Sequence, residues 1–376
     1  MKFVIEQSKL VDVVNWVSRS LSTRPIQTAL LGIVIDAEGG KVHLSGSDLE
    51  TASRASTDAE VATPRRVLVP GKLLAEISRS LPNKPVTIQL DGTRVLVNSG
   101  SAKFTLPVLP INEYPNLPTL PETSGIIASD IFATAVNQVA IAAGRDESLP
   151  TLTGIHVDIS GETISLAATD RYRLAVCEIN WTPTNPELTT SALLRARTLA
   201  DAARTIATTK ELSFAIAPTT AADRLIGFQT DSKSMTSRQL DGTFPPYRHL
   251  LPAESTATAV IEVAKLLDSV RRVALVADKN IPLRLKFNGQ SLQLEAGAGD
   301  DAQATEEIDI SYTGEAIDIA FNPQFLTDGL NALGTTYVNM AFTGSNKPAL
   351  LSGKNKVDGE IDGSYRYLLM PMRYAS

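Results

Sequence analysis

The side chains best suited to metal binding or nucleophilic catalysis are few and far apart in this sequence. His43, His156 and His249 are its histidines, and Cys177 is its single cysteine. Zinc sites take their ligands from closely spaced Cys and His pairs, and one cysteine provides neither such a site nor an intrachain disulfide. The sequence also lacks a nucleophile elbow, a phosphate-binding P-loop and a dinucleotide fingerprint. We therefore interpret the histidines as surface or structural residues and predict no catalytic centre, no metal site and no cofactor.

Acidic residues offer two further candidates for chemistry. Asp48 and Asp170 each follow a hydroxyl residue at the end of a strand-like run, in LSGSD and LAATD. Two such carboxylates could work as an acid and a base. Asp side chains also accept hydrogen bonds from nearby backbone amides, however, and we predict this turn-forming role, repeated by duplication. The acidic stretch 300–307 lacks the spacing and central glycine of an EF-hand, and we interpret it as a solvated loop.

Apolar periodicity indicates that these residues belong to one unit written three times. Each round reads helix, strands, helix, strands, with a period of roughly 120–130 residues, which is typical of a duplicated domain. The predicted helices cover residues 8–21, 71–81, 129–143, 195–208, 263–273 and 325–333. The pattern predicts an α+β fold of three similar domains.

Two proline-rich segments, 107–122 and 242–253, separate the rounds and have the character of linkers. They place the domains at residues 1–120, 121–253 and 254–376.

Composition restricts the class of protein. The net charge of −6 argues against a protein that is basic overall and binds nucleic acid by that charge. It leaves room for one whose basic residues are gathered on an inner surface. The N-terminus has no apolar signal-peptide core, and no apolar run approaches the ~18 residues of a membrane span. Together with the single cysteine, this favours a cytoplasmic protein.

Three segments carry a resemblance to a known family. They are Ala168–Ala175 (ATDRYRLA), Asp241–Tyr247 (DGTFPPY) and Met370–Arg373 (MPMR). In this order and at this spacing, the chain resembles the bacterial DNA polymerase III β subunits, the sliding clamps, over its whole length. It departs from the family where Arg171-Tyr172 replaces a frequent Gly-His pair and where His249 replaces a common arginine.

The resemblance implies a processivity factor without enzymatic activity of its own. Clamps of this family are head-to-tail dimeric rings, with two helices per domain inside and β-sheets outside, that encircle duplex DNA and slide on it. Such a ring need not grip phosphates tightly, which answers the objection from net charge. The DNA-facing residues that the comparison implies are Arg19, Arg24, Lys72, Arg79, Arg145, Arg197, Arg204, Lys265, Arg271 and Arg272.

The resemblance also implies a dimer interface and a shared docking cleft. The interface residues are Phe104, Leu106, Val273, Ala274 and Leu275. The cleft takes short peptides of the form Gln-Leu-x-Leu-Phe from the replicative polymerase α subunit, the clamp loader, and translesion and repair proteins. It is expected to comprise Leu152, Thr169, Arg171, Tyr172, Arg173, Leu174, Pro245, His249, Leu250, Phe325, Leu368, Met370, Pro371, Met372 and Arg373. A cytoplasmic, nucleoid-associated protein without membrane contact is expected.

Two other classes of protein stay open at this stage. An enzyme on a duplicated α+β fold would show convergent titratable residues in a cleft. A monomeric adhesion or carbohydrate-binding array would show a secretory signal and exposed aromatics, whereas aromatic residues make up 5% of this chain.

Overall fold

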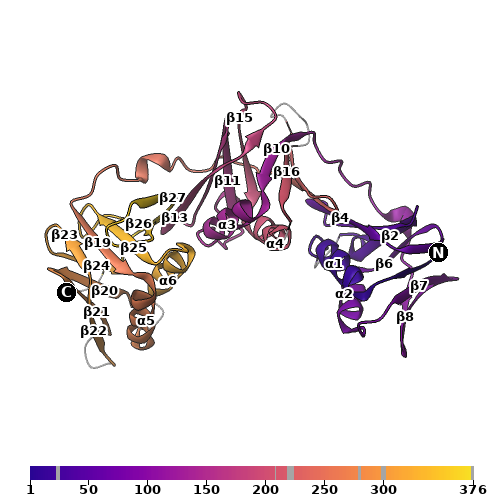
Figure 1. Cartoon of the computed structure of the whole chain (residues 1–376), viewed down its shortest axis with the longest axis horizontal. Coiled ribbons are helices and arrows are strands. Elements are labelled where there is room, and N and C mark those ends of the chain that lie inside the picture. The colour runs from indigo at the N-terminus through magenta and orange to yellow at the C-terminus, as the bar shows by residue number, and fades with distance from the viewer. Residues whose placement is uncertain (23–25, 208, 218–223, 278–280, 298–301, 374–376) are drawn as a thin grey trace. The chain divides into compact units, whose positions relative to one another are not determined.

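The computed structural model describes residues 1–22, 26–207, 209–217, 224–277, 281–297 and 302–373 (Figure 1). The chain forms two compact units. Unit 1 comprises Met1–Asp130, Trp181–Leu188 and Asp201–Gln239, and unit 2 comprises Ile131–Asn180, Thr189–Ala200 and Leu240–Ser376.

Unit 1 contains two antiparallel sheets. The smaller one has the order β5 (Glu60–Thr63), β1 (Lys2–Ile5), β7 (Val86–Asp91), β8 (Arg94–Ser99), β9 (Ala102–Pro107). The larger one has the order β14 (Thr182–Pro183), β10 (Thr123–Ala128), β16 (Glu211–Ile216), β17 (Leu225–Gln229), β18 (Lys233–Arg238), β4 (Thr51–Asp58), β3 (Lys41–Ser47), β2 (Gly32–Glu38), β6 (Arg65–Pro70).

Unit 2 is built in the same way. Its larger sheet has the order β15 (Thr189–Arg195), β11 (Gly154–Ser160), β12 (Thr163–Thr169), β13 (Arg173–Asn180), β27 (Ile361–Leu369), β26 (Ala349–Lys354), β25 (Tyr337–Phe342), β19 (Ala257–Glu262), β23 (Ser311–Thr313). Its smaller sheet has the order β22 (Ala304–Asp309), β21 (Ser291–Ala296), β20 (Leu283–Asn288), β24 (Ile317–Phe321).

The six predicted helices are confirmed, with ends that differ from the prediction by up to three residues. They are α1 (Gln7–Ser18), α2 (Gly71–Ser80), α3 (Ser129–Ala140), α4 (Ala196–Ile206), α5 (Val263–Val273) and α6 (Pro323–Ala332). Short 3₁₀ segments are η1 (Thr28–Leu31), η2 (Ile111–Glu113), η3 (Pro150–Thr153), η4 (Arg248–Leu250) and η5 (Ala274–Val276). In unit 1, α1 packs on α2 and on β3 and β4; in unit 2, α5 packs on α6.

The element order repeats three times, as the sequence predicted. The described residues give each round nine strands and two α-helices, so that β4, β13 and β22 are equivalent, as are β9, β18 and β27. Strand β4 pairs with β18, and β13 pairs with β27, both antiparallel. Successive rounds are therefore joined by continuous sheets, and the predicted α+β fold of similar domains is confirmed.

The predicted role of the two aspartates as turn formers is also confirmed. Asp48 Oδ1 accepts hydrogen bonds from the backbone amides of Glu50 and Thr51 at 3.0 and 2.7 Å. Asp170 Oδ1 accepts the equivalent bonds from Tyr172 and Arg173 at 3.0 and 3.1 Å. The residue after each aspartate, Leu49 or Arg171, has φ of 79°, a left-handed conformation that such a turn requires.

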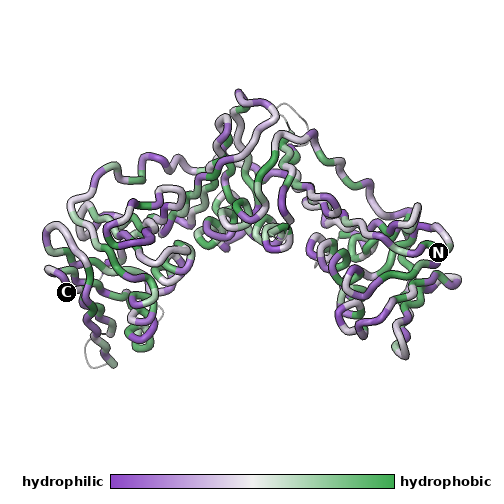
Figure 2. Tube along the Cα trace, viewed as in Figure 1, coloured by the Kyte–Doolittle hydropathy of each residue, from purple (hydrophilic) through white to green (hydrophobic). Residues whose placement is uncertain are grey.

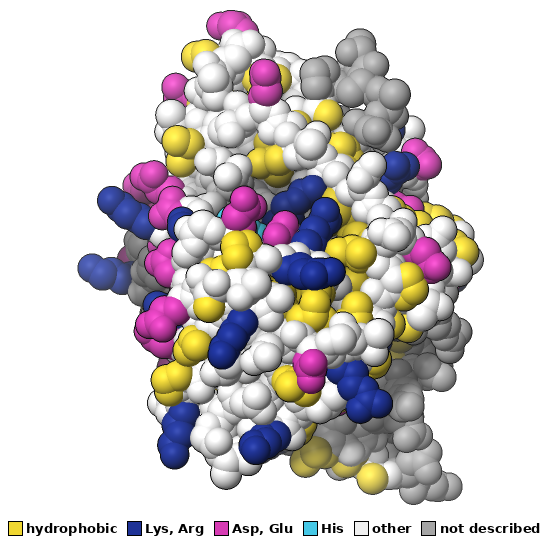
Figure 3. All heavy atoms as spheres, turned by 90° about the vertical axis from the view of Figure 1, so that its right-hand side faces the viewer, with side chains coloured by type: hydrophobic (Ala, Val, Ile, Leu, Met, Phe, Trp, Pro, Cys, Tyr) yellow, Lys and Arg dark blue, Asp and Glu magenta, His cyan; other side chains and the backbone are white. Residues whose placement is uncertain are grey.

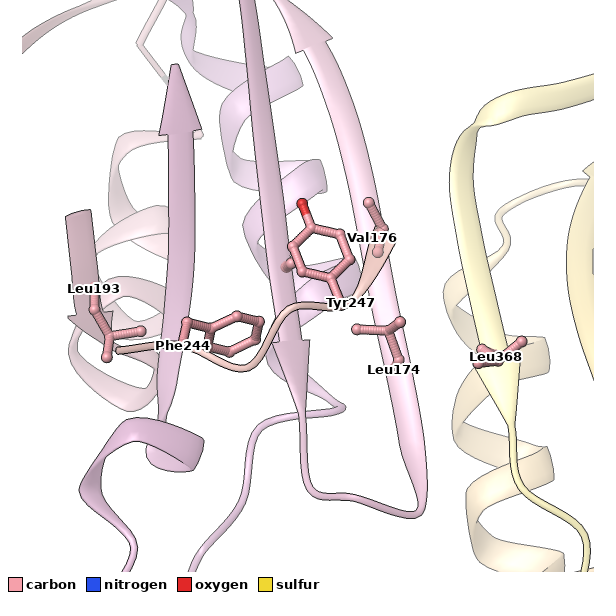
Figure 4. Packing of buried hydrophobic residues seen from close by; sticks show 7 residues of the cluster. Leu174, Val176, Leu193, Phe244, Tyr247 and Leu368 are labelled. Carbon is pink, nitrogen blue, oxygen red and sulfur yellow. The ribbon is translucent and has the colours of Figure 1, made fainter. Parts of the chain in front are cut away.

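The linkers cover the sheets with their aromatic residues. Tyr114, in the first linker, packs on a buried cluster that contains Val34 and Leu68. Phe244 and Tyr247, in the second, belong to a buried cluster with Leu174, Val176, Leu193 and Leu368 (Figure 4). Figure 2 shows hydrophobic and hydrophilic residues interspersed along both units. Buried and more exposed positions alternate in strands such as β8 and β21, as one-sided burial demands, whereas β2, β12 and β13 are buried almost throughout. The first linker thus packs on the round that it follows, and the second packs where the second round meets β27 of the third.

The interpretation of 300–307 as a solvated loop was wrong where the structure describes it. Residues 300 and 301 lie outside the described residues, but Ala304–Asp309 forms β22. Glu306 on this strand accepts hydrogen bonds from Ser269 at 2.6 Å and from the Arg272 guanidinium at 2.9 Å. These bonds lower the pKa of Glu306 to about 2, the bond from Arg272 having the larger effect. The density of acidic residues concealed a strand, one of whose acids, Glu306, is paired with α5.

The turn at Asp48 provides a stability test. Asp48→Ala removes the acceptor for two amides, and we expect it to lower the free energy of unfolding of unit 1 by about 1–2 kcal/mol. Asp48→Asn keeps the oxygen and should lose less. Glu50→Ala, at an exposed position in the same turn, is the control and should change stability by less than about 0.5 kcal/mol. Urea unfolding followed by circular dichroism measures this; equal effects of Asp48→Ala and Glu50→Ala would contradict the assignment.

Candidate functional site

A cavity of about 590 Å³ opens in unit 2 beside the turn between β12 and β13. The turn provides one wall, the segment after α3 provides another, and the first half of α6 provides the third. It is lined by Ala143, Gly144, Arg145, Asp146, Leu149, Leu152, Asp170, Arg171, Tyr172, Arg173, Gln324, Phe325 and Asp328.

Arg173 organises this cavity. Its side chain is 7% exposed; Nε donates to Asp170 Oδ2 at 2.9 Å, and Nη1 donates to Asp328 Oδ2 at 2.7 Å. Its guanidinium carbon lies 4.2 Å from the centre of the Phe325 ring. Burial opposes the charge, but Tyr367 and the carboxylates outweigh it, and the pKa of Arg173 is raised. The turn and α6 are thus held together by one charged, planar group.

Apolar and aromatic side chains accompany this network. The ring of Tyr172, which is 59% exposed, lies 6.4 Å from the ring of Phe325. The backbone amide of Met370 donates to the carbonyl of Tyr172 at 2.9 Å, and that of Met372 donates to the carbonyl of Ala320 at 2.8 Å. The C-terminal segment is therefore attached both to the turn and to β24. Met370 is 42% exposed and follows the end of β27, so it is not a core residue of a terminal strand.

The structure brings part of the predicted cleft together directly. Leu152, Arg171, Tyr172, Arg173 and Phe325 line the cavity.

Other predicted residues lie next to it along the strands. Thr169 accepts a hydrogen bond from the Arg171 amide inside the turn. Leu174 and Leu368 are cross-strand partners in the buried cluster.

The remaining predicted residues are not among the cavity-lining side chains. Pro245, His249 and Arg373 are exposed, Leu250 is 48% exposed, and Pro371 and Met372 are partly buried.

Sequence reasoning missed several residues that line the cavity, among them Asp146, Gln324 and Asp328. Gln324 Nε2 donates to Asp328 Oδ1 at 2.7 Å, as residues four apart on a helix can. Asp328 lies one helical turn beyond the predicted Phe325 and thus on the same face of α6. The three-residue spacing from Phe325 was the sequence feature that could have pointed to Asp328. Without knowledge of its arginine partner, however, this spacing does not distinguish a buried ion pair from a solvent-exposed carboxylate.

The predicted DNA-facing side chains are exposed wherever the structure describes them. Arg24 lies outside the described residues. Lys72 and Arg79 lie on α2, Arg197 and Arg204 on α4, and Lys265, Arg271 and Arg272 on α5, while Arg19 follows α1. Arg204, Arg271 and Arg272 form ion pairs with Asp201, Asp268 and Glu306 respectively. Arg145 lies in the cavity described above.

Three family models match consecutive segments of the chain. They are described as the N-terminal domain of the DNA polymerase III beta subunit, matching residues 1–118, its central domain, matching 126–246, and its C-terminal domain, matching 248–373. A beta sliding clamp of Streptomyces coelicolor is 48% identical over 99% of this chain and 99% of its own. The chain belongs to the DNA polymerase III beta subunit family.

Further relatives of the family agree with this assignment. The beta sliding clamp homolog GriR of Streptomyces muensis is 42% identical over 100% of both chains. Among solved structures, the sliding clamp of Pseudomonas aeruginosa bound to griselimycin is 25% identical, with a TM-score of 0.90 and coverage of 100% of both chains.

Membership in the family establishes what this chain does. It is a sliding clamp, a non-catalytic processivity factor of DNA polymerase, and a DNA-associated replication protein. The family implies DNA encirclement, dimerisation and partners that carry peptide motifs. Every helix among the described residues is too short or too polar to cross a lipid bilayer. The described residues also contain no cluster of three or more His, Cys, Asp or Glu side chains that could hold a metal ion.

The Arg173 network gives a test of what holds the cavity. Arg173→Met leaves two partly buried carboxylates without a cation, and we expect it to lower the free energy of unfolding of unit 2 by about 2–4 kcal/mol. Arg171→Met removes the same charge from an exposed neighbour in the turn and should change stability by less than about 0.5 kcal/mol. Urea unfolding compares the two; equal destabilisation would show that Arg173 does not organise the cavity.

Proposed function

We propose that two copies of this chain close head to tail into a ring that encircles duplex DNA. The observation that carries the proposal is the repeated pairing of β4 with β18 and of β13 with β27. The equivalent strands β9 and β22 are edge strands of their sheets. An edge strand offers a row of unpaired backbone groups, and β9 of one copy with β22 of another would repeat the same junction. Two such seams, one at each end of the chain, close a ring.

The two internal junctions also supply the register of the proposed seam. Ser53 of β4 lies opposite Met235 of β18. Counted from the adjacent hairpin turns, Ala304 is equivalent to Ser53 and Phe104 is equivalent to Met235. The seam therefore places Ala304 opposite Phe104.

The same register places Thr305 opposite Lys103, so that Glu307 becomes the diagonal neighbour of Lys103 on the same face. Leu275, which is 84% exposed on η5, would contact the partner beside the strands. Val273 and Leu106, which were also expected at the interface, are 2% and 0% exposed and would support it from within their own sheets.

The remaining expectations follow from this ring. The domains would be 1–120, 121–253 and 254–376, and the basic residues that follow α1 or lie on α2, α4 and α5 would line the hole. Three of these residues, Arg204, Arg271 and Arg272, already pair with acids, which favours weak, salt-dependent contact with phosphates and suits sliding. The protein would act in the cytoplasm, on the nucleoid.

The cavity at the β12–β13 turn is the proposed docking site for partner peptides. Leu149, Leu152 and Phe325 give the cavity an apolar part, and the exposed Tyr172 also lines it, which suits Leu and Phe anchors. The exposed Met370 is hydrogen-bonded to the same turn. Methionine adapts to varied partners, which a shared site needs. We propose Gln-Leu-x-Leu-Phe segments of the replicative polymerase α subunit, the clamp loader, and translesion and repair proteins as its ligands.

The seam is tested by charge reversal. Lys103→Glu and Glu307→Lys should each weaken the dimer, because each places like charges side by side, and the double variant should restore it. Leu275→Asp should give monomers, since it places an unpaired charge in an apolar contact. Lys356→Glu, in an exposed loop between β26 and β27, is the control. Sedimentation equilibrium or light scattering gives the mass; a double variant no more dimeric than either single one would refute the register.

The docking site is tested by fluorescence titration with a Gln-Leu-x-Leu-Phe peptide. We expect binding in the micromolar range, ~ −7 to −9 kcal/mol. Deletion of Met370–Ser376 should abolish binding and leave the dimer mass unchanged, and Tyr172→Ala should weaken binding about tenfold. Ile361→Ala, an exposed apolar position at the far end of β27, is the matched control. Full binding by the truncated protein would place the site elsewhere.

A further inference from the structure

Unit 1 carries a second hollow, of about 280 Å³, that the proposed clamp function does not use. It lies on the sheet face formed by β2, β3, β4, β6 and β18. Arg66 lies opposite Asp36, Asp36 lies opposite His43, and Arg54, two strands away, lies opposite Ser45 and Ser234. Figure 3, which views the chain from its N-terminal side, shows Lys and Arg side chains gathered near acidic ones on that face. The hollow is therefore polar and rich in cations.

Arg54 is the least compensated of these cations. Its guanidinium is half-buried and donates to the backbone carbonyls of Leu117 and Pro118 at 3.3 and 2.9 Å. Burial lowers the pKa of Arg54, because the charge is desolvated. Within the described part of the chain, neither Arg54 nor Arg66 forms an ion pair. Carbonyl oxygens satisfy donor hydrogens but do not neutralise a charge.

The equivalent sheet face of unit 2 differs in how its arginines are paired with carboxylates. Asp158, which is equivalent to Asp36, forms an ion pair with Arg248 at 2.8 Å. Glu178, which is equivalent to Ser56, forms an ion pair with Arg366, which stands at the position of Ser234. Each arginine there has its own carboxylate. In unit 1, Asp36 keeps its acid opposite Arg66, but Ser56 and Ser234 stand at the positions of Glu178 and Arg366. Among the described residues the Arg54 guanidinium has no acid partner.

We propose that this hollow binds a glutamate or aspartate side chain from an acidic peptide segment of a partner protein. A carboxylate would supply the acid that unit 2 supplies internally, and a guanidinium can hold it with two parallel hydrogen bonds. Asp36 and Asp231 also line the hollow, so a singly charged carboxylate is favoured over a phosphate dianion, which both would repel. The hollow is large enough for one side chain, with serine hydroxyls available as further donors.

The test uses a rhodamine-labelled Gly-Glu-Gly-Glu-Gly peptide, with the full-length protein and fluorescence anisotropy at low salt, where surface charges are least screened. Arg66→Gln should weaken binding about five- to tenfold, the loss of one charge-assisted hydrogen bond. Arg54→Gln should do the same. Arg65→Gln is the matched control, because Arg65 is the exposed neighbour on the same strand, points to the opposite face and loses the same charge. The Gly-Gln-Gly-Gln-Gly peptide should not bind.

Each alternative outcome has a distinct meaning. Equal weakening by Arg65→Gln and Arg66→Gln would overturn the site and indicate non-specific attraction. Displacement of the peptide by inorganic phosphate at far lower concentration than by acetate would overturn the assignment to a carboxylate. Arg66→Gln alters an exposed side chain, so its result stands even where Arg54→Gln disturbs the linker. A protein truncated at Met370 should still bind the acidic peptide, which separates this site from the docking cavity of unit 2.

Discussion

The edge of a β-sheet carries backbone amides and carbonyls without partners. The joining of successive rounds in this chain depends on how these edge groups are paired, and so does the proposed seam between two copies. Strand β4 pairs with β18 and β13 pairs with β27, so each round of the repeat completes the sheet of the one before. Both pairings have the same register: Thr51 faces Ser237 and Arg173 faces Leu369, three residues after the aspartate of each turn. The register fixes which side chains meet at a junction, and the two junctions differ in function only through those side chains.

Each junction is secured on its helical side by one residue at an equivalent helix position. Trp16 on α1 donates its indole N–H to the carbonyls of Arg54 and Ser234, one on each strand of the first junction. On α3, Gln138 accepts at Oε1 from the Cys177 thiol and at its backbone carbonyl from the Tyr365 hydroxyl, again one bond to each strand. Burial raises the pKa of the Cys177 thiol to about 12, so this cysteine is a packing residue and a poor nucleophile. The two rounds thus use the same helix position to contact the junction, but one carries an indole donor and the other a side-chain amide and a backbone carbonyl that accept.

The two turns show how one structural device acquires a binding role. At the first junction the aspartate turn presents Leu49 and Glu50, and the following Thr51 is a buried strand residue. At the second, the same turn presents Arg171 and Tyr172, and the following Arg173 reaches across to Asp328 on α6. The left-handed φ at Arg171 accounts for the glycine that relatives of this family often carry there, since glycine adopts it without strain. A turn that is structural in one round becomes a wall of the cavity in the next.

The sequence by itself determined the three-fold repeat, the six helices and the role of the aspartate turns, because apolar periodicity and side-chain-to-backbone hydrogen bonding are local properties. It did not reveal nine strands among the described residues: β1, β5, β10, β14, β15, β19, β23 and β24, whose alternation of apolar and polar residues is short or weak, and β22, where acidic residues concealed a strand. Of the candidate site, the sequence identified Arg173 and Phe325 but missed Asp328. The role of this helix carboxylate depends on its ion pair with Arg173, which lies on a strand far away in the sequence. Which face of each sheet has its charges paired, and which has them unpaired, was decided by the tertiary structure alone, since it depends on cross-strand neighbours that no local spacing specifies.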